Sequence, residues 1–399
     1  MNYKTCPVSE LIDEIAMGPF GSNIKVDCFV DKGIPVLNGS NLEGFELSEK
    51  SFRYVTEEKA DSLKKANAHK GDVVITHRGT LGQIVYIPQT AQRDRYVISQ
   101  SQFRVKCNKN VLPEYFVYYF HTPIGQHKLL SNASQVGVPA LARPSSTFQK
   151  IEIEIPDLET QKKVVKLIGS LQTRITTNTE INDNLYEMVN AYYTSLFREN
   201  DCEMTTVGNY AERIYSGGTP MTSNAAYWNG TFGWFSSGET RNRFVISTEK
   251  TITQAGIDNS STKLAIKYDI VMASAGQGFT RGQTSMLLID TYVNQSVIVI
   301  KSERNILPYL FWNLANRYDE LRAISDSSSI RGSLTTKMIA AFEIPLANEQ
   351  SLQAFADFAW SVIPQIENNL LENERLTALR DSLLPKLMSG EIDVSDIQL

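Results

Sequence analysis

Arginine and glutamine side chains recur at matching places in the two halves of this 399-residue chain. Arginine pairs well with the edge of guanine and glutamine with that of adenine, so these residues on exposed loops suit contacts to double-stranded DNA in the major groove. For each residue alone, a solvated charge or a glutamine that caps a strand is the commoner role. The candidates lie in a Gly-containing turn, at the start of a later strand and in the loop before a long helix: Arg78, Gln83, Gln100, Gln102, Arg143, Gln277, Arg281, Gln295 and Arg331.

No catalytic constellation accompanies these residues. The chain has no GxxxxGK[ST] phosphate loop, and the glycines of residues 276–278 are a fragment of a GxGxxG pattern without its βαβ setting. No Asn-Pro-Pro-Tyr or Asp-Pro-Pro-Tyr stretch is present to hold a base for amino-methylation. Metal-ligand spacing is absent from the four histidines, His69, His77, His121 and His127. We therefore expect a non-catalytic chain with neither a metal site nor a cofactor of its own.

Two long amphipathic helices are the elements that must position the loops. Heptad spacing, in which steps of four and three residues alternate, presents one narrow apolar face to a partner helix. In the first helix, residues 161–197, this face is Val164, Ile168, Leu171, Ile175, Asn178, Asn182, Leu185, Val189, Tyr192 and Leu196. Adding 191 to each number gives the face of the second helix, residues 350–388, where only Arg380 breaks the pattern.

Asparagines recur at two positions of this face, as Asn178 and Asn182 and again as Asn369 and Asn373. A buried amide lowers stability but can fix helix register, because it must meet a hydrogen-bonding partner. Antiparallel packing about a pseudo-two-fold axis would place Asn178 opposite Asn373 and Asn182 opposite Asn369. The alternative is that the asparagines are solvated residues on two unrelated helices.

The repeat extends beyond the helices, so the chain contains two copies of one plan. The matching segments are residues 8–18 and 207–217, 71–75 and 268–272, 99–101 and 294–296, 112–116 and 307–311, and 154–156 and 343–345. Within each copy the pattern predicts short strands and one aromatic helix. We expect strands at 73–76, 84–87 and 102–105 with a helix at 113–120, and strands at 270–273, 285–289 and 297–300 with a helix at 308–314.

The predicted fold class is α+β. It comprises two mixed, β-rich domains, residues 1–156 and 200–347, separated by two long helices that form an antiparallel coiled coil, residues 157–199 and 348–399. Asp157 and Asn348 lie where the N-caps are expected, and Gly390 marks the end of the second helix. Pro364 predicts a kink within that helix.

The net charge of −5 comes from the C-terminal segment. Residues 348–399 carry 3 basic and 9 acidic groups, whereas residues 1–156 carry 18 and 16 and residues 200–347 carry 13 and 13. The near-neutral domains permit a basic face. Four scattered cysteines without a disulfide framework, the lack of an apolar N-terminal run and the lack of a long apolar segment predict a cytoplasmic protein that does not span a membrane.

Sequence runs at the helix ends resemble a known family. Residues 155–161 and 344–350 share the pattern Ile-Pro-x4-Gln, and the second helix ends in LLPKLMSGEI, residues 383–392, of which residues 193–197 are a half-copy. With these runs the chain resembles the specificity (S) subunits of type I restriction-modification systems over essentially its full length. In one departure, the Pro-Pro-Leu run usual before the helix glutamine is replaced by Asp157-Leu158-Glu159 and by Leu346-Ala347-Asn348.

The resemblance implies that the globular copies are target recognition domains for a bipartite, asymmetric DNA sequence. A helix of about 38 residues would span about 57 Å, enough to hold two domains on major-groove faces about 34 Å apart. The implied partners are two methyltransferase (M) subunits that bind S-adenosylmethionine and two restriction (R) subunits that use ATP and Mg²⁺. Acidic residues on the second helix suit either a basic protein partner or a solvated face: Glu367, Glu372 and Glu374.

Two other functions remain open from the sequence. A coiled-coil scaffold with protein-binding heads would explain the helices and the acidic segment but not the matched arginine and glutamine loops. An S-like subunit of a smaller restriction system without a separate motor would differ only in its partners.

Overall fold

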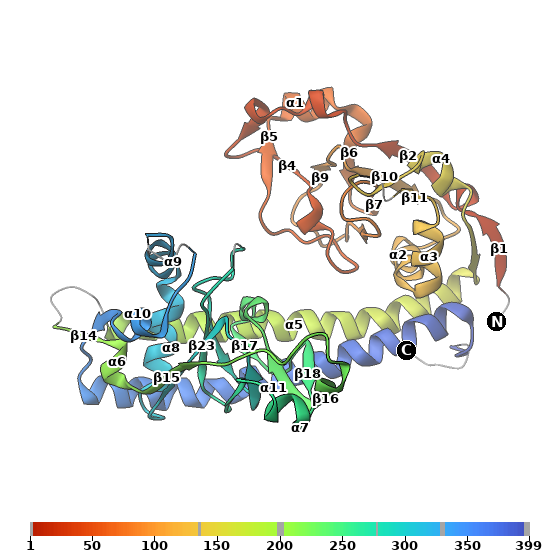
Figure 1. Ribbon diagram of the computed structural model, residues 1–399. Helices are drawn as coiled ribbons and strands as arrows, with labels where there is room; N and C mark the ends of the chain where they lie inside the picture. Colours follow the sequence, from red (N-terminus) through yellow and green to blue (C-terminus); the bar gives the residue numbers. More distant parts are fainter. Residues whose placement is uncertain (1–2, 135–136, 198–202, 277, 328–331, 395–399) are drawn as a thin grey trace. The chain divides into compact units, whose positions relative to one another are not determined.

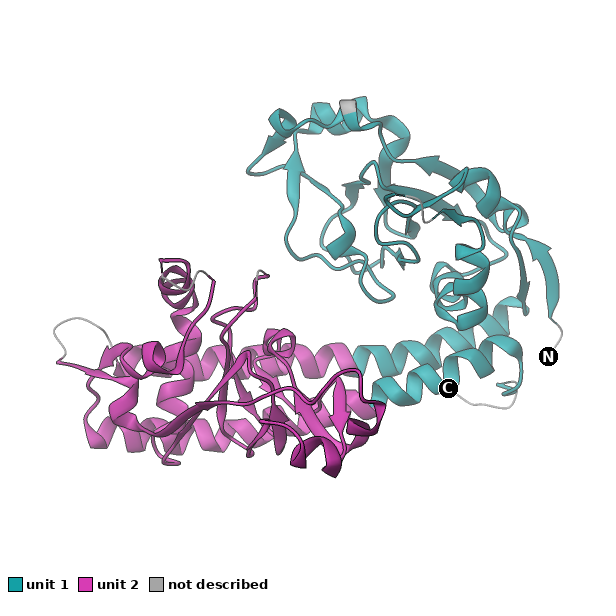
Figure 2. Ribbon diagram, viewed as in Figure 1, with its two compact units in different colours: residues 1–174, 376–399 teal, residues 175–375 magenta. Residues whose placement is uncertain are grey.

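The computed structural model describes residues 3–134, 137–197, 203–276, 278–327 and 332–394 (Figure 1). The chain divides into two compact units: unit 1 is residues 1–174 with 376–399, and unit 2 is residues 175–375 (Figure 2). Each unit therefore contains one globular part and a stretch of both long helices, α5 (Leu158–Leu196) and α11 (Glu349–Ser389).

Unit 1 is built on an antiparallel sheet with the strand order β2-β10-β7-β8. A second sheet, β3-β5-β4-β9-β6, contains one parallel pairing, between β4 and β9. Short ladders join β1 to β13 and β11 to β12. The strands are β1 (Lys4–Pro7), β2 (Ile12–Met17), β3 (Phe29–Val30), β4 (Ile34–Val36), β5 (Arg53–Val55), β6 (Asn67–His69), β7 (Asp72–Thr76), β8 (Ile84–Tyr86), β9 (Arg95–Val97), β10 (Gln102–Cys107), β11 (Ala133–Ser134), β12 (Ala140–Leu141) and β13 (Glu152–Ile155).

Unit 2 repeats this plan. Its main sheet has the order β15-β23-β20-β21-β17, its second sheet the order β18-β16-β22-β19, and β14 pairs with β24 as β1 does with β13. The strands are β14 (Met204–Thr206), β15 (Ala211–Ser216), β16 (Trp228–Phe235), β17 (Phe244–Val245), β18 (Lys250–Ile252), β19 (Lys263–Ala265), β20 (Ile270–Ala273), β21 (Thr284–Leu287), β22 (Thr291–Val293), β23 (Val297–Ser302) and β24 (Glu343–Pro345).

Short helices cover the sheets in both units. Every described side chain from Tyr115 to Phe120 is buried, so this aromatic run forms the core between the main sheet and the helix pair. The helices of unit 1 are α1 (Glu57–Ser62), α2 (Pro113–His121), α3 (Pro123–Leu130) and α4 (Pro144–Gln149); those of unit 2 are α6 (Val207–Tyr210), α7 (Gln254–Asp258), α8 (Leu307–Asn316), α9 (Tyr318–Ser327) and α10 (Thr336–Ala340). The strands and aromatic helices predicted from the repeat are confirmed.

The long helices run antiparallel, and every residue of the predicted heptad faces is buried or half-buried. In unit 1 the buried Val164 and Ile168 join Leu384 and Leu387 in one core, because the helix ends supply the apolar surface that the sheet and α2 must cover. In unit 2 the buried Val189 and Phe355 do the same. The helix α11 continues through Pro364 as one element.

Both predicted N-caps are confirmed. Asp157 Oδ1 accepts a hydrogen bond from the Thr160 amide at 2.8 Å, and Asn348 Oδ1 accepts one from the Ser351 amide at 2.8 Å. The Thr160 amide also holds the pKa of the Asp157 carboxyl below its usual range. Gly390, with φ at +75°, follows the last residue of α11, a backbone conformation that glycine adopts without strain.

The repeated Ile-Pro-x4-Gln pattern does not mark equivalent positions. Gln161 is fully buried, where its Oε1 accepts from the Leu112 amide at 2.9 Å and its Nε2 donates to the Asn110 carbonyl at 3.1 Å. Gln350 is instead exposed. Because Leu346 and Ala347 are inserted between Pro345 and the Asn348 cap, the position equivalent to Gln161 is taken by the buried Leu352.

Candidate nucleic-acid interface

The first candidate turn connects β7 to β8 in unit 1. Gly79 and Gly82 have φ values of +89° and +88°, which favour glycine, and the Gly79 amide donates to the Pro139 carbonyl at 2.9 Å. Arg78 is exposed at this turn, next to a backbone bridge with Ala140. Its guanidinium is therefore presented on a fixed backbone, as a contact to a base edge requires.

Gln83 supports this turn from within the unit. Its Nε2 donates to the Gly39 carbonyl at 2.9 Å, and its Oε1 accepts from Thr76 Oγ1 at 3.1 Å. Both ends of the half-buried amide are thus engaged by the protein. The structure gives Gln83 a bracing position, while a base contact by this side chain stays a prediction.

Gln100 and Gln102, which the sequence places together at the start of a strand, lie in different surroundings. Gln100 is exposed, and its carbonyl lies 3.1 Å from His77 Nε2. Burial lowers the pKa of His77, which favours the neutral form of its ring. Gln102 lies in β10 with 1% exposure, and its Oε1 accepts from the Ser99 amide at 2.9 Å. The expectation that Gln102 lies on a reachable loop is thereby corrected, because this side chain caps the strand from inside.

Two further candidates lie on exposed loops. Arg143 is exposed in the left-handed region, with φ at +46°, as the residue before α4. Gln295 is exposed before β23, and its Oε1 accepts a hydrogen bond from Thr219 Oγ1. Gln277 and Arg331 lie outside the described residues. For Arg143 and Gln295 the structure supplies the exposure that DNA contact requires, and the contact itself stays a prediction.

The second candidate turn, residues 274–283, connects β20 to β21 in unit 2. Its arginine is buried, unlike the exposed Arg78 of the first turn. Arg281 is 5% exposed, forms an ion pair with Asp326 and donates from Nη1 to the Gly276 carbonyl at 3.3 Å. The expectation of an arginine free to reach a base is corrected here. Arg281 instead ties the turn to α9, because Asp326 belongs to that helix.

A helix that the sequence did not single out braces the turn in each unit. In unit 1, Gln126 of α3 donates from Nε2 to the Gly82 carbonyl at 2.9 Å. In unit 2, Arg322 of α9 donates from Nη1 to the Gly278 carbonyl and Tyr318 donates to the Phe279 carbonyl, both at 2.6 Å. The sequence contains only a weak indication of these bracing helices. Both α3 and α9 directly follow the aromatic helix of their unit, but the side chains that brace the turn differ in type.

The predicted asparagine pairs are present on the helix faces of unit 2. Asn178 donates to Asn373 Oδ1 at 3.0 Å, and Asn369 donates to Asn182 Oδ1 at 2.8 Å. Asn178 also donates to Glu372 Oε2 at 2.8 Å. The geometry is the one that the antiparallel repeat predicts, whereas a role of these amides in fixing the register stays a prediction.

Acidic side chains on α11 are partly engaged by the protein itself. Glu367 forms an ion pair with Lys267 at 2.6 Å, and Glu372 accepts the hydrogen bond from Asn178. Glu374 is exposed. Of the acidic residues proposed as a docking surface, two therefore have internal roles.

The break in the heptad pattern at Arg380 has a structural reason in unit 1. The Arg380 guanidinium carbon lies 4.9 Å from the centre of the Phe45 ring, and Nη1 donates to Gln172 Oε1 at 2.7 Å. Phe45 also packs edge-on against His121, with ring centres 4.6 Å apart. The arginine thus connects the helix pair to the loop before β5 through a cation–π contact.

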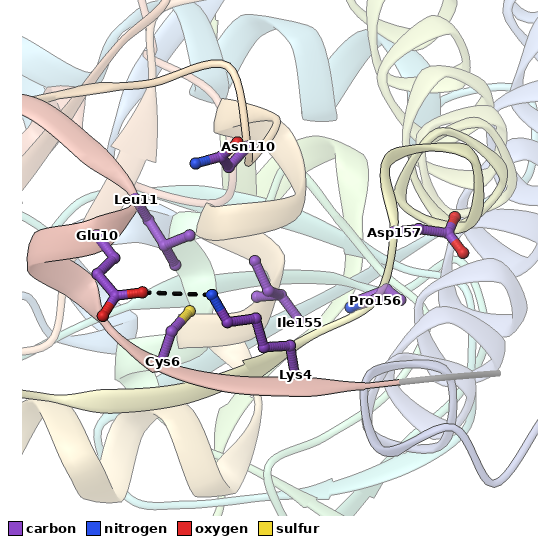
Figure 3. A pocket seen from close by; sticks show the side chains of 8 residues that line it. All are labelled: Lys4, Cys6, Glu10, Leu11, Asn110, Ile155, Pro156 and Asp157. Atoms are coloured by element: carbon purple, nitrogen blue, oxygen red, sulfur yellow. Dashed lines mark hydrogen bonds and ion pairs between the residues drawn. The ribbon is translucent and has the colours of Figure 1, made fainter.

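A hollow of about 370 Å³ lies beside the start of α5 (Figure 3). Its wall includes Leu11 and Pro156, and Lys4 and Glu10 form an ion pair at 3.4 Å across it. Leu11 corresponds to Tyr210 of unit 2, whose hydroxyl donates to the Ala347 carbonyl at 3.3 Å and accepts from the Ala347 amide at 3.0 Å. The hollow therefore marks a place where the two copies differ in packing.

The described residues contain no group of three or more His, Cys, Asp or Glu side chains that could hold a metal ion. In the same part of the chain, no helix is long and apolar enough to cross a membrane.

The duplicated architecture agrees with a duplicated sequence match. Residues 22–187 and again residues 201–374 match the family described as "Type I restriction modification DNA specificity domain". The chain belongs to this family. In family terms it is a specificity subunit of a type I restriction system, and the internal repeat is a duplication of its DNA specificity domain.

Relatives in this family support the assignment along the chain. The chain is 22% identical over 407 residues to the Type I restriction enzyme HindI specificity subunit of Haemophilus influenzae, with 81% of this chain and 87% of that protein covered. It is 26% identical over 266 residues to the Type I restriction enzyme EcoR124I/EcoR124II specificity subunit of Escherichia coli, with 63% of each covered. The crystal structure of the S subunit from M. genitalium has the same fold, with a TM-score of 0.60, 15% identity and coverage of 97% and 96%.

Proposed function

We propose that this specificity subunit recognises a bipartite, asymmetric sequence in double-stranded DNA. Residues 1–156 and 200–347 act as target recognition domains, and each contacts one half-site, mainly in the major groove. The observation that carries the proposal is the braced turn that occurs in both units, at the same place between two strands of the main sheet. Exposed polar side chains beside these turns, such as Arg78 and Gln295, suit base edges.

The helix pair sets the distance between the half-sites in this proposal. Helices of 39 and 41 residues have lengths of about 58 and 61 Å at 1.5 Å per residue. That length exceeds the spacing of about 34 Å between successive major-groove faces on one side of the duplex. The asparagine pairs supply a polar layer that would disfavour a shifted register.

In this proposal, partner subunits carry out the methylation and restriction reactions. Two methyltransferase subunits that bind S-adenosylmethionine would modify adenine within each half-site, and two restriction subunits would use ATP and Mg²⁺ in the same cytoplasmic assembly. This chain binds DNA and positions those subunits without catalysing a step. A smaller system without a separate motor would use this chain in the same way with fewer partners.

The test is purification of the chain with the methyltransferase subunit encoded next to it, followed by single-molecule sequencing to map methylated adenines in host DNA. We expect a bipartite motif that disappears when this gene is deleted. If a complex forms and no methylation depends on it, the recognition proposal fails. If the methylated motif is a single uninterrupted sequence, the proposal that the target is bipartite fails.

A matched pair of variants tests the first recognition turn. We expect Arg78→Ala to relax base preference at one position of one half-site, because a good arginine contact to guanine discriminates by about 1–3 kcal/mol. Arg93→Ala removes an exposed arginine of the same unit outside the turn and should leave the motif unchanged. A uniform loss of affinity with Arg78→Ala would identify a phosphate contact instead.

A further inference from the structure

Each unit exposes one phenylalanine far more than a folded protein usually does. Phe279 has 85% and Phe20 has 83% of its surface exposed, the two largest exposed fractions among the large apolar side chains of the described residues. Phe279 lies in the 274–283 turn. Phe20 precedes Gly21, where an added Cβ would lie 2.2 Å from Gln100 Oε1. Phe279 therefore belongs to a turn that the proposed function assigns to DNA, whereas Phe20 lies in a loop beside the Gln100 side chain.

The turn that carries Phe279 is held from behind. Its carbonyl accepts a hydrogen bond from the Tyr318 hydroxyl at 2.6 Å, and the preceding carbonyl, of Gly278, accepts from Arg322 Nη1 at 2.6 Å. Asp326 of α9 pairs with the buried Arg281 and lies 3.7 Å from Arg322 Nε. The backbone on both sides of the phenyl ring is thus fixed, while 85% of the surface of the residue is exposed.

A fixed and exposed apolar ring gains free energy only when a partner removes it from water. On the major-groove edges of the bases, the C5-methyl group of thymine is the apolar feature, and a phenylalanine ring is one of its recognised contacts. An apolar wedge in the minor groove is usually accompanied by basic side chains that enter the groove. The arginine of this turn, Arg281, is buried, and the neighbouring Arg322 is engaged by the Gly278 carbonyl and by Asp326, so both guanidinium groups already have partners within the protein.

We propose that Phe279 contacts the C5-methyl group of a thymine in the half-site bound by unit 2, and so determines part of the specificity. This inference rests on the proposed function and names the chemical group that the second turn recognises. It also gives that turn a reading side chain in place of Arg281, which acts as a brace.

The test uses the complex of the full chain with its methyltransferase subunit and a pool of randomised DNA duplexes. The wild-type complex should enrich a bipartite motif with a required thymine in one half-site. In a duplex of that motif, replacement of this thymine by uracil removes only the methyl group and should weaken binding about fourfold. Phe279→Ala should weaken binding to the thymine duplex about tenfold and bind the thymine and uracil duplexes equally well.

The control is Leu264→Ala, which shortens an exposed apolar side chain of the same unit in β19 and should keep the wild-type preference. If Phe279→Ala retains the thymine-to-uracil difference, or loses affinity equally for all sequences, the inference is overturned while the proposed function stands. If Phe279→Ala fails to assemble with the methyltransferase subunit, the ring is a protein contact and the inference is again overturned. If the wild-type complex enriches no sequence, the proposed function fails and the inference fails with it.

Discussion

Asn178 and Asn373, one on each long helix, share a hydrogen bond of 3.0 Å on a largely apolar face. Asn178 is 1% exposed and Asn373 is half-buried, and the pair formed by Asn369 and Asn182 repeats this combination of one buried and one half-buried amide. In an antiparallel pair of helices, the numbers of two facing residues have a constant sum. When the two helices are copies of one another, the first asparagine of one helix therefore faces the second asparagine of the other. The polar layer therefore follows directly from the duplication.

Replacement of both members of one pair should stabilise the chain. The double variant Asn178→Leu with Asn373→Leu should raise the free energy of unfolding by about 1 kcal/mol, because both amides are removed from the apolar face together. Asn178→Leu alone should gain less or lose stability, because Asn373 Oδ1 then loses its donor. Denaturant unfolding of these two variants and of the wild type measures these differences.

The same variants test a role in register. If the amides select one register, the double variant should give more than one assembled species with the methyltransferase subunit in native mass spectrometry. Asn184→Leu, at an exposed position of α5, is the control and should leave one species. Unchanged stability and a single species in the double variant would show that the amides neither cost stability nor choose the register.

Arg281 should act on the stability of unit 2 rather than on one base. Arg281→Ala removes the ion pair with Asp326 and the hydrogen bond to the Gly276 carbonyl, and should lower the free energy of unfolding by about 1–3 kcal/mol. Arg241→Ala breaks an exposed ion pair with Glu249 and should cost less than about 1 kcal/mol. Unchanged stability of Arg281→Ala, together with relaxed preference in one half-site, would restore the base-reading role predicted from the sequence.

The helices and their pairing were predictable because heptad spacing is a local pattern repeated many times. The partners of Asn178 and Asn182 followed from the antiparallel alignment of two copies, which needs no knowledge of the loops. The strands were predictable for the same reason, since each apolar run occurs twice. A feature supported by many residues tolerates a single exception such as Arg380.

The loop side chains were not predictable to the same degree, because their exposure depends on distant residues. Arg78 and Arg281 occupy similar turns, yet Arg281 is buried by its pairing with Asp326, which lies 45 residues further on. Gln350 shows a related difference between sequence pattern and structure. The repeated pattern suggested that it is equivalent to Gln161, but an insertion of two residues moved the helix cap and left Gln350 on the surface. A motif fixes spacing along the chain, whereas the cap decides which side of the helix each residue faces.

Leu11→Tyr should stabilise unit 1. The hollow beside Leu11 is lined by Pro156 and Asn110 and lies where Tyr210 stands in the second copy, so a tyrosine ring has an apolar wall to cover. Filling such a hollow should raise the free energy of unfolding by about 1 kcal/mol. Denaturant unfolding is the measurement, and Lys4→Tyr, which adds a ring at an exposed position on the rim, should have no such effect. A loss of stability in Leu11→Tyr would mean that the ring fits only with the two-residue insertion of unit 2.

His121 should make unit 1 less stable in mild acid. Burial lowers the pKa of this histidine, and the nearby Arg380 lowers it further, although the Ile84 carbonyl at 2.8 Å from Nε2 and the carboxylate of Asp381 act in the opposite direction. As the pH falls below about 6.5, the usual histidine pKa, the unfolded chain takes up a proton before the folded chain does. The free energy of unfolding should therefore be constant above that pH with respect to this group and fall below it.

The measurement must separate His121 from His77, because burial also lowers the pKa of His77 and so adds to the pH dependence of the wild type. The informative quantity is therefore the difference between the wild type and His121→Gln, which cannot titrate at this position. Denaturant unfolding at pH 7.5 and 5.5 should show a smaller loss for His121→Gln than for the wild type, and equal losses would show that His121 is not kept neutral by its surroundings.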